Sequence, residues 1–186
     1  MKRHIDILFT LIAAIVLIIP CLLIALAVRL TSNGPALYWS DRIGLNNKLF
    51  SMPKFRSMRI DTPTTATHLL GDPDSYLTPI GGFLRKSSLD EFPQLWCVLR
   101  GEMSLVGPRP ALHNQYDLKK LRTDCNVHTL RPGITGLAQV SGRDELSMQD
   151  KVTQDHRYLK TQSLATDFKI MWLTVVRVVR RDGVTH

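Results

Sequence analysis

The chain begins with a long run of apolar residues. No charged side chain occurs from Ile7 to Val28, and the run consists almost entirely of Leu, Ile, Val, Ala and Phe. At a rise of about 1.5 Å per residue, a helix of this length could cross the hydrocarbon core of a membrane. A cleaved signal peptide fits less well, because the apolar region of a signal peptide is shorter than the run from Ile7 to Val28.

Pro20 lies well inside this run and leaves two topologies open. Proline removes a helical hydrogen bond and clashes with the carbonyl of Val16, which favours a kink or a break. A broken helix can enter the membrane and return, but prolines are tolerated in spanning helices, and the residues alone slightly favour a plain span. Lys2, Arg3 and Arg29 make both flanks positive, so the flanks do not demand opposite sides of a membrane.

The remaining pattern predicts short strands, loops and helices. Residues 36–39 and 48–52 look extended, residues 61–79 and 131–143 read as loops, and residues 88–100, 145–160 and 164–182 have helical character. The helix over 145–160 is expected to be a mostly polar surface helix. The helix over 164–182 is amphipathic and basic, which suits either a membrane surface or an ordinary core.

Two of these segments allow more than one interpretation. Ser88 and Glu91 match a capping box, but Pro93 fits the helix over 88–100 better if Asp90 lies near the N-cap. Gly101 is the expected C-cap. In residues 131–143, the glycines allow either a close approach of the backbone to a ligand or a pair of tight turns.

Composition narrows the class of partner. The chain has 186 residues and a formal net charge of +8, which favours nucleic acid, phosphorylated substrates or an anionic membrane surface. Its three cysteines fit no metal motif and predict free thiols in a reducing compartment, with Cys97 in the core. No phosphate-binding loop of the G-x-x-x-x-G-K-[ST] type is present, and the six histidines are scattered, which argues against a zinc site.

The strongest candidate chemistry lies in residues 81–110. Adjacent carboxylates, Asp90 and Glu91, stand between Arg85 and Arg109, and Arg109 lies in a stiff Pro-Arg-Pro step. One carboxylate can hold a divalent metal, the other can attack or accept a proton, and the arginines can neutralise phosphate oxygens. The pattern therefore indicates phosphate chemistry.

Four motifs carry a resemblance to a known family. They are, in order, Lys54-Phe55-Arg56-Ser57-Met58, Ser88-Leu89-Asp90-Glu91-Phe92-Pro93-Gln94-Leu95, Gly101-Glu102-Met103-Ser104-Leu105-Val106-Gly107-Pro108-Arg109-Pro110 and Arg131-Pro132-Gly133-Ile134-Thr135-Gly136-Leu137-Ala138-Gln139-Val140. Together they closely resemble the bacterial sugar transferases, the monotopic phosphoglycosyl transferases. The resemblance implies an α+β, mainly helical fold with amphipathic interfacial helices. It also implies that residues 1–30 form a re-entrant membrane anchor, helix-break-helix at Pro20, and residues 31–186 a cytoplasmic catalytic domain.

The resemblance also implies an activity. These enzymes transfer a sugar-1-phosphate from a nucleotide sugar, here expected to be a UDP-sugar, to a polyprenol phosphate such as undecaprenyl phosphate. Asp90 would be the nucleophile and Glu91 the Mg²⁺ ligand, with Arg85 and Arg109 binding substrate phosphates. Further substrate contacts are expected from residues in or beside the matching motifs: Lys54, Arg131, Gln139 and Arg143. The expected partners are the nucleotide sugar, polyprenol phosphate and membrane lipid, without nucleic acid, at the cytoplasmic face of the bacterial inner membrane.

Two alternatives remain open at this stage. A membrane-tethered basic protein that binds nucleic acid or anionic lipid would account for the charge and the apolar helix, but not for Asp90 and Glu91 beside the Pro-Arg-Pro step. A nucleotide-sugar hydrolase would use the same carboxylates with water as acceptor. Products with and without polyprenol phosphate separate transfer from hydrolysis.

Overall fold

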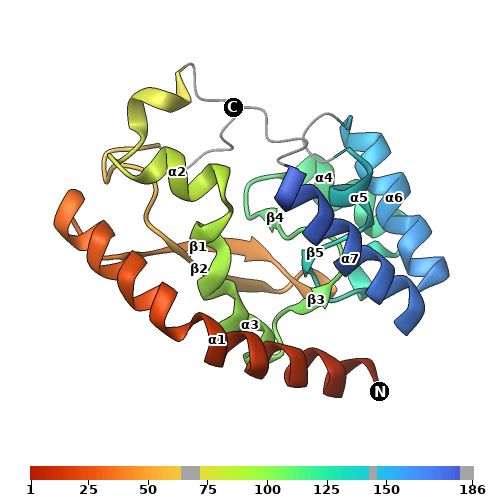
Figure 1. Cartoon of the computed structure of the whole chain (residues 1–186). Coiled ribbons are helices and arrows are strands. Elements are labelled where there is room, and N and C mark those ends of the chain that lie inside the picture. The colour runs from red at the N-terminus through yellow and green to blue at the C-terminus, as the bar shows by residue number, and fades with distance from the viewer. Residues whose placement is uncertain (64–71, 143–145, 181–186) are drawn as a thin grey trace.

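A helix of 30 residues, α1 (Lys2–Thr31), starts the fold and lies along one side of the other elements (Figure 1). The computed structural model describes residues 1–63, 72–142 and 146–180. Within them the protein is mainly helical with a small sheet, as the sequence predicts. The short connecting elements are the 3₁₀ helices η1 (Leu45–Asn47), η3 (Pro73–Tyr76) and η5 (Val127–Thr129).

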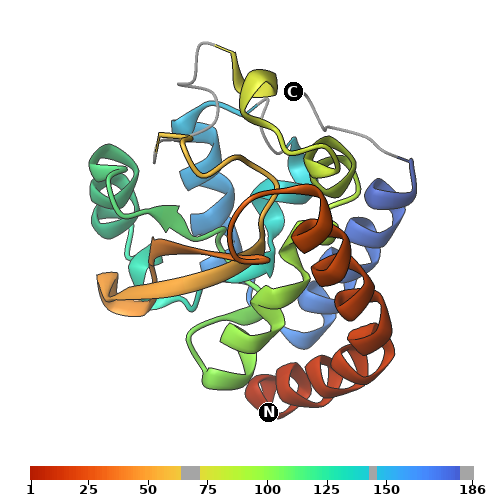
Figure 2. The same cartoon turned by 90° about the vertical axis from the view of Figure 1, so that its left-hand side faces the viewer.

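Helix α1 bends but does not end at its internal proline. Pro20 lies inside one continuous helix. Figure 2 shows that the helix axis changes direction along its length, a bend of the kind that an internal proline produces. Only Asp6, Thr10 and Val28 of this helix are buried. By length and composition α1 could cross a membrane, and it differs from a soluble core helix because only 6% of its most apolar stretch is buried.

An antiparallel hairpin forms the centre of the main sheet. Strands β1 (Leu37–Ile43) and β2 (Leu49–Phe55) pair along their full length, so that Tyr38 faces Lys54 and Arg42 faces Phe50. The turn between them uses Asn46 at φ 53° and Asn47, residues that tolerate the left-handed region. The short strand β4 (Ala111–Leu112) adds to the other edge of β1. The extended segments predicted here are confirmed and are longer than expected.

The loop predicted over 131–143 is wrong in part, because it contains a strand and a helix. Strand β5 (Gly133–Thr135) pairs in parallel with β3 (Ser104–Val106), and α5 (Leu137–Ser141) follows. The glycines here serve the approach of two backbone segments. A Cβ on Gly136 would lie 2.1 Å from the carbonyl oxygen of Gly107, and one on Gly133 would lie 2.1 Å from the Gly107 nitrogen. Residues 143–145 lie outside the described part.

The single helix predicted over 88–100 is divided at Gln94. A 3₁₀ helix, η4 (Leu89–Gln94), contains Pro93, and α3 (Leu95–Arg100) follows it. The capping-box interpretation is wrong, because Ser88 adopts a left-handed conformation at φ 56° and its side chain makes no cap hydrogen bond. Gly101 is confirmed as the C-cap, at φ 83°.

The C-terminal half supplies the helices at the end of the molecule that holds the second, two-stranded sheet (Figure 1). These helices are α4 (Tyr116–Asp124), α6 (Met148–Thr161) and α7 (Leu164–Arg180). Helix α6, predicted as a mostly polar surface helix, is more buried than expected, since Val152, Asp155 and Tyr158 are buried. Of the predicted helix over 164–182, residues beyond 180 lie outside the description.

Helix α7 packs one face on the core and leaves apolar side chains exposed on the other face. Ile170 belongs to a core cluster with Val106, Val140 and Tyr158. The opposite face leaves apolar side chains in solvent, among them Phe168, Trp172, Val175 and Val178. Phe168 meets Phe9 of α1 edge to face, with ring centroids 5.9 Å apart.

The cysteines behave as predicted. All three are free thiols, and Cys97 is fully buried in a cluster with Phe50, Met52, Val98 and Met103. Burial raises the pKa of Cys97 to about 12, and Glu102 acts in the same direction. This thiol is therefore a core side chain without thiolate chemistry.

Candidate active site

The 3₁₀ helix η4 brings both carboxylates against the sheet. Asp90 and Glu91 lie in its first turn. The residues that flank them, Leu89 and Phe92, pack on the cluster formed by Val28, Phe55 and Leu84. Cys21, Ile24 and Ala25 of α1 pack on the same cluster. The carboxylate pair is therefore built beside the C-terminal half of the apolar helix.

Glu91 is bound by two cations. Its Oε1 accepts hydrogen bonds from Nζ of Lys54 at 2.8 Å and from Nη2 of Arg109 at 2.6 Å. Its Oε2 is 3.4 Å from Nη1 of Arg109. Burial alone opposes ionisation, but Arg109 and Lys54 outweigh it and hold the pKa of Glu91 well below its usual value. Glu91 is therefore an ionised carboxylate at neutral pH.

Asp90 is in a different electrostatic state from its neighbour. Its side chain is buried, with 7% of the residue exposed. Burial raises the pKa of Asp90 and the charge of Glu91 adds to this, whereas Lys54, Arg109 and Arg85 lower it. Two adjacent carboxylates with opposite pKa shifts are typical of a site in which each has its own role.

Arg85 reaches the same site from another element. It lies in the last turn of α2 (Gly81–Lys86) and contributes to the pKa of Asp90. Its Nη1 is 3.1 Å from Sδ of Met58. The structure thus brings Arg85 and Arg109, which are separated by 24 positions in the chain, to the same pair of carboxylates.

Arg42 is a cation of this site that the sequence analysis did not single out. Its Nε donates to Oγ of Ser40 at 3.0 Å, and its Nη1 donates to the carbonyl oxygen of Pro110 at 3.3 Å. Burial and Arg109 lower the pKa of Arg42 to about 10, against the opposite effects of Glu91 and Tyr38. It therefore remains charged at neutral pH.

The alternation of residues along β1 is the sequence feature that could have pointed to Arg42. Tyr38, Ser40 and Arg42 alternate along β1, and the register sets Tyr38 opposite Lys54. Tyr38 also lies under Arg56, whose guanidinium carbon is 5.9 Å from the ring centroid. Alternation along β1 alone puts these three side chains on one face of the sheet, and pairing with β2 adds Lys54 to that face beside Tyr38.

The other expected substrate-binding residues are more dispersed. Lys54 lies in the site, on Glu91. Arg131 is exposed, and its Nε donates to the carbonyl oxygen of Gly101, at the far end of α3 from the carboxylates. Gln139 donates through Nε2 to the carbonyl oxygen of Ile134 at 2.9 Å, and among the described residues its buried Oε1 has no hydrogen-bond partner. Arg143 lies outside the described residues, so its predicted role stays a prediction.

The site has few ligands for a metal ion. Across residues 1–63, 72–142 and 146–180 there is no group of three or more His, Cys, Asp or Glu side chains suited to a metal. Mg²⁺, however, commonly uses one or two carboxylates and takes its remaining ligands from water and substrate phosphates. Asp90 and Glu91 fit an ion of that kind, one shared with a bound diphosphate, and do not fit a cage made by protein alone.

Comparisons with known proteins identify the family of this chain. A model of the family described as "Bacterial sugar transferase" matches residues 1–181. The chain therefore belongs to the bacterial sugar transferase family. It is 38% identical over 199 residues to the UDP-galactose-lipid carrier transferase of Erwinia amylovora, an alignment that covers 98% of this chain and 41% of that protein.

Two further relatives carry glucose in their names. Both are called UDP-glucose:undecaprenyl-phosphate glucose-1-phosphate transferase. The protein from Xanthomonas campestris is 43% identical over 166 residues, covering 85% of this chain and 34% of that protein. The one from Caulobacter vibrioides is 42% identical over 172 residues, covering 87% of this chain and 63% of that protein. The chain spans about two-fifths of the length of the Erwinia relative.

Proposed function

We propose that this protein is a phosphoglycosyl transferase, which moves a sugar-1-phosphate from a nucleotide sugar, UDP-linked by analogy with its relatives, to undecaprenyl phosphate or a similar polyprenol phosphate. One observation carries the proposal. Asp90 and Glu91 lie in a cluster of cations, while the residues that flank them pack on the same cluster as α1. An anionic lipid acceptor and an anionic soluble donor can meet at such a place.

Asp90 is the nucleophile of the proposed reaction. A carboxylate oxygen of Asp90 attacks the phosphorus that carries the sugar, and the bond from that phosphorus to the nucleoside monophosphate breaks. The phosphate of the lipid carrier then attacks the same phosphorus, and the Asp90 carboxylate leaves as it was. The products are a nucleoside monophosphate and a polyprenol diphosphate sugar, so atoms and charge balance over the two steps.

The cations have separate tasks in this mechanism. Arg85 and Arg109 offset charge on the phosphoryl oxygens during transfer. Lys54 and Arg109 keep Glu91 ionised, which makes Glu91 the better of the two carboxylates to hold Mg²⁺. When bound, the ion stabilises charge on the diphosphate and on the leaving nucleotide. Arg131, Gln139 and Arg143 remain expected substrate contacts.

We also propose that residues 1–30 form a re-entrant anchor on the cytoplasmic face of the bacterial inner membrane, with residues 31–186 as the catalytic domain. The two ends of α1 support this topology because both contact the same domain. Nζ of Lys2 is 2.6 Å from Oδ2 of Asp167, and Arg3 donates to the carbonyl oxygens of Val98 and Leu99. Near the other end, Val28 is buried against Phe55.

Exposed aromatic side chains on three other helices suit contact with the membrane interface. They are Phe83 on α2, Trp96 on α3, and Phe168 and Trp172 on α7, with exposed fractions between 47% and 68%. Aromatic rings of this kind favour the headgroup region of a bilayer. In this proposal these rings contact the headgroup region of the membrane while the lipid carrier enters the site.

The test is a screen of nucleotide sugars with purified protein in detergent or nanodiscs, scored by release of nucleoside monophosphate. We expect release that requires polyprenol phosphate and yields a polyprenol diphosphate sugar. Release with water as the only acceptor would instead establish the hydrolase alternative. Salt-sensitive binding of DNA without any turnover would instead support the alternative of a membrane-tethered basic protein that binds nucleic acid.

A further inference from the structure

The two carbonyl oxygens that follow Pro108 are held by arginines from distant parts of the chain. Nη1 of Arg122, in α4, donates to the carbonyl oxygen of Arg109 at 2.8 Å. Nη1 of Arg42, in β1, donates to the carbonyl oxygen of Pro110 at 3.3 Å. The backbone of the Pro-Arg-Pro step is therefore fixed from two sides.

Arg122 is itself fixed by a buried carboxylate of α6. Its Nε and Nη2 donate to Oδ2 of Asp155 at 3.0 Å and 2.7 Å. Asp155 is 1% exposed, and the Arg122 side chain is 13% exposed. Three of the five donors of one guanidinium thus join α6 to the loop that carries Arg109, in a planar geometry that lysine cannot reproduce.

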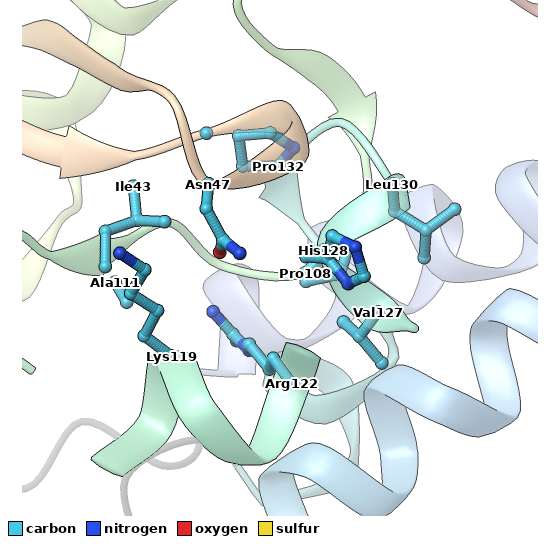
Figure 3. A pocket seen from close by; sticks show the side chains of 11 residues that line it. Ile43, Asn47, Pro108, Ala111, Lys119, Arg122, Val127, His128, Leu130 and Pro132 are labelled. Carbon is cyan, nitrogen blue, oxygen red and sulfur yellow. The ribbon is translucent and has the colours of Figure 1, made fainter. Parts of the chain in front are cut away.

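Arg122 lines a small cavity, and the described residues around that cavity do not include Asp90 or Glu91. Figure 3 shows its side chain among those of Asn47, Lys119 and His128, around a cavity of about 30 Å³. A cavity of this volume has room for a water molecule or two, and a nucleotide sugar does not fit. Any effect of Arg122 on transfer must therefore pass through another residue.

Arg109 is the residue through which that effect passes. Its side chain binds Glu91, while its own carbonyl oxygen is bound by Arg122. Because Pro108 and Pro110 restrict the backbone on both sides, the place of this peptide determines where the guanidinium reaches. We propose that Arg122, oriented by Asp155, is a positioning residue that sets Arg109 against Glu91 for phosphoryl transfer. The proposal rests on the proposed function, since Arg109 is the proposed phosphate ligand.

A double-mutant cycle tests this proposal. We expect Arg122→Met to lower turnover by about 10- to 100-fold, the cost of misplacing a group at the reacting centre. In an Arg109→Met background the same change should alter turnover by less than about twofold, because the residue on which Arg122 acts is gone. Losses that multiply in the double variant, or full turnover in Arg122→Met, would overturn the proposal.

Matched variants separate positioning from folding. Lys120→Met removes an exposed ion pair with Asp124 on the same helix and should leave turnover unchanged. If Arg122→Met does not fold, Arg122→Lys takes its place in the same cycle, with an expected loss smaller than that of the methionine variant. A loss in Lys120→Met equal to that in the Arg122 variant would assign the effect to helix α4 as a whole and overturn the positioning role.

A measurement without substrate keeps this inference separate from the proposed function. Hydrogen exchange followed by mass spectrometry should show faster exchange of the peptide 104–115 in the Arg122 variant than in wild type or Lys120→Met. Unchanged exchange would mean that Arg122 does not hold the Pro-Arg-Pro step. Absence of transfer by the wild-type protein would refute the proposed function and leave this structural result intact.

Discussion

Nη2 of Arg109 lies 2.6 Å from Oε1 of Glu91, and Nζ of Lys54 lies 2.8 Å from the same oxygen. Arg109 and Lys54 thus hold the pKa of Glu91 well below its usual value, whereas burial raises the pKa of the adjacent Asp90 against the opposing effects of Lys54, Arg109 and Arg85. The first three predictions follow from this difference.

Replacing Asp90 by asparagine should abolish transfer. We expect a loss on the order of 10³-fold or more, because the attacking oxygen is removed. Mass spectrometry should detect a phosphosugar adduct on the wild-type protein incubated with donor alone, and none on Asp90→Asn. Turnover at wild-type level in Asp90→Asn would remove Asp90 from the mechanism.

The apparent affinity for Mg²⁺ should fall in Glu91→Gln. The amide oxygen can still accept a hydrogen bond from Arg109 or Lys54, but it lacks the charge that a hard cation prefers. We expect the Mg²⁺ concentration for half-maximal turnover to rise by about tenfold or more, the scale of effect seen when metal-site interactions are altered. Asp124→Asn, which alters an exposed ion pair with Lys120, is the control and should leave the Mg²⁺ titration unchanged.

The activity of the protein should fall at acid pH with a midpoint above the ordinary range for aspartate. Burial raises the pKa of Asp90, and only the ionised form attacks, so kcat/KM should rise as pH increases through that raised value. Arg85 lowers the pKa of Asp90, so Arg85→Met should move the midpoint to higher pH. A midpoint that is the same in both proteins would contradict this assignment of charges.

The folding free energy should respond to pH with opposite signs at the two carboxylates. The pKa of Glu91 is depressed in the folded protein, so its contribution to stability is present above the unfolded pKa and is lost as pH falls through the folded value. The pKa of Asp90 is raised, so its ionised form is disfavoured by folding. At pH 8 we therefore expect Asp90→Asn to melt at a higher temperature than wild type.

Gly136→Ala should destabilise the fold near the site. A Cβ at this position would lie 2.1 Å from the carbonyl oxygen of Gly107, which is backbone and cannot move aside cheaply. We expect a loss of about 1–3 kcal/mol in the free energy of unfolding, as for other overpacked sites, measured by denaturant titration. Gly82→Ala is the control, since among the described residues its Cβ would meet Leu77 alone, at an ordinary 3.6 Å, and it should be neutral or slightly stabilising.

Both ends of α1 should be accessible from one side of the membrane. His4 precedes the apolar stretch and is exposed, and His113 is an exposed residue of the catalytic domain. In a background that lacks the native cysteines Cys21, Cys97 and Cys125, a membrane-impermeant thiol reagent should label both His4→Cys and His113→Cys in sealed inverted vesicles. In intact cells or spheroplasts it should label neither. Labelling of the two positions from opposite sides would establish a plain span and exclude the re-entrant anchor.

Sequence by itself determined the local features of this protein. The uncharged run from Ile7 to Val28 specified the long helix, because helix length and apolar composition are properties of consecutive residues. The spacing of apolar residues predicted α7, and Gly101 predicted the end of a helix. Asp90, Glu91 and Arg109 were identified as a unit from motifs that lie close together in the chain.

Tertiary structure decided which side chains meet across long separations. Lys54 reaches Glu91 only because β2 packs against η4, and Arg42 enters the same site only through the pairing of β1 with β2. Asp155, expected on a polar surface, is buried because Arg122 pairs with it from another helix. Such contacts depend on how helices and strands pack together. The periodicity of residues along one helix or strand does not identify the element that packs against it.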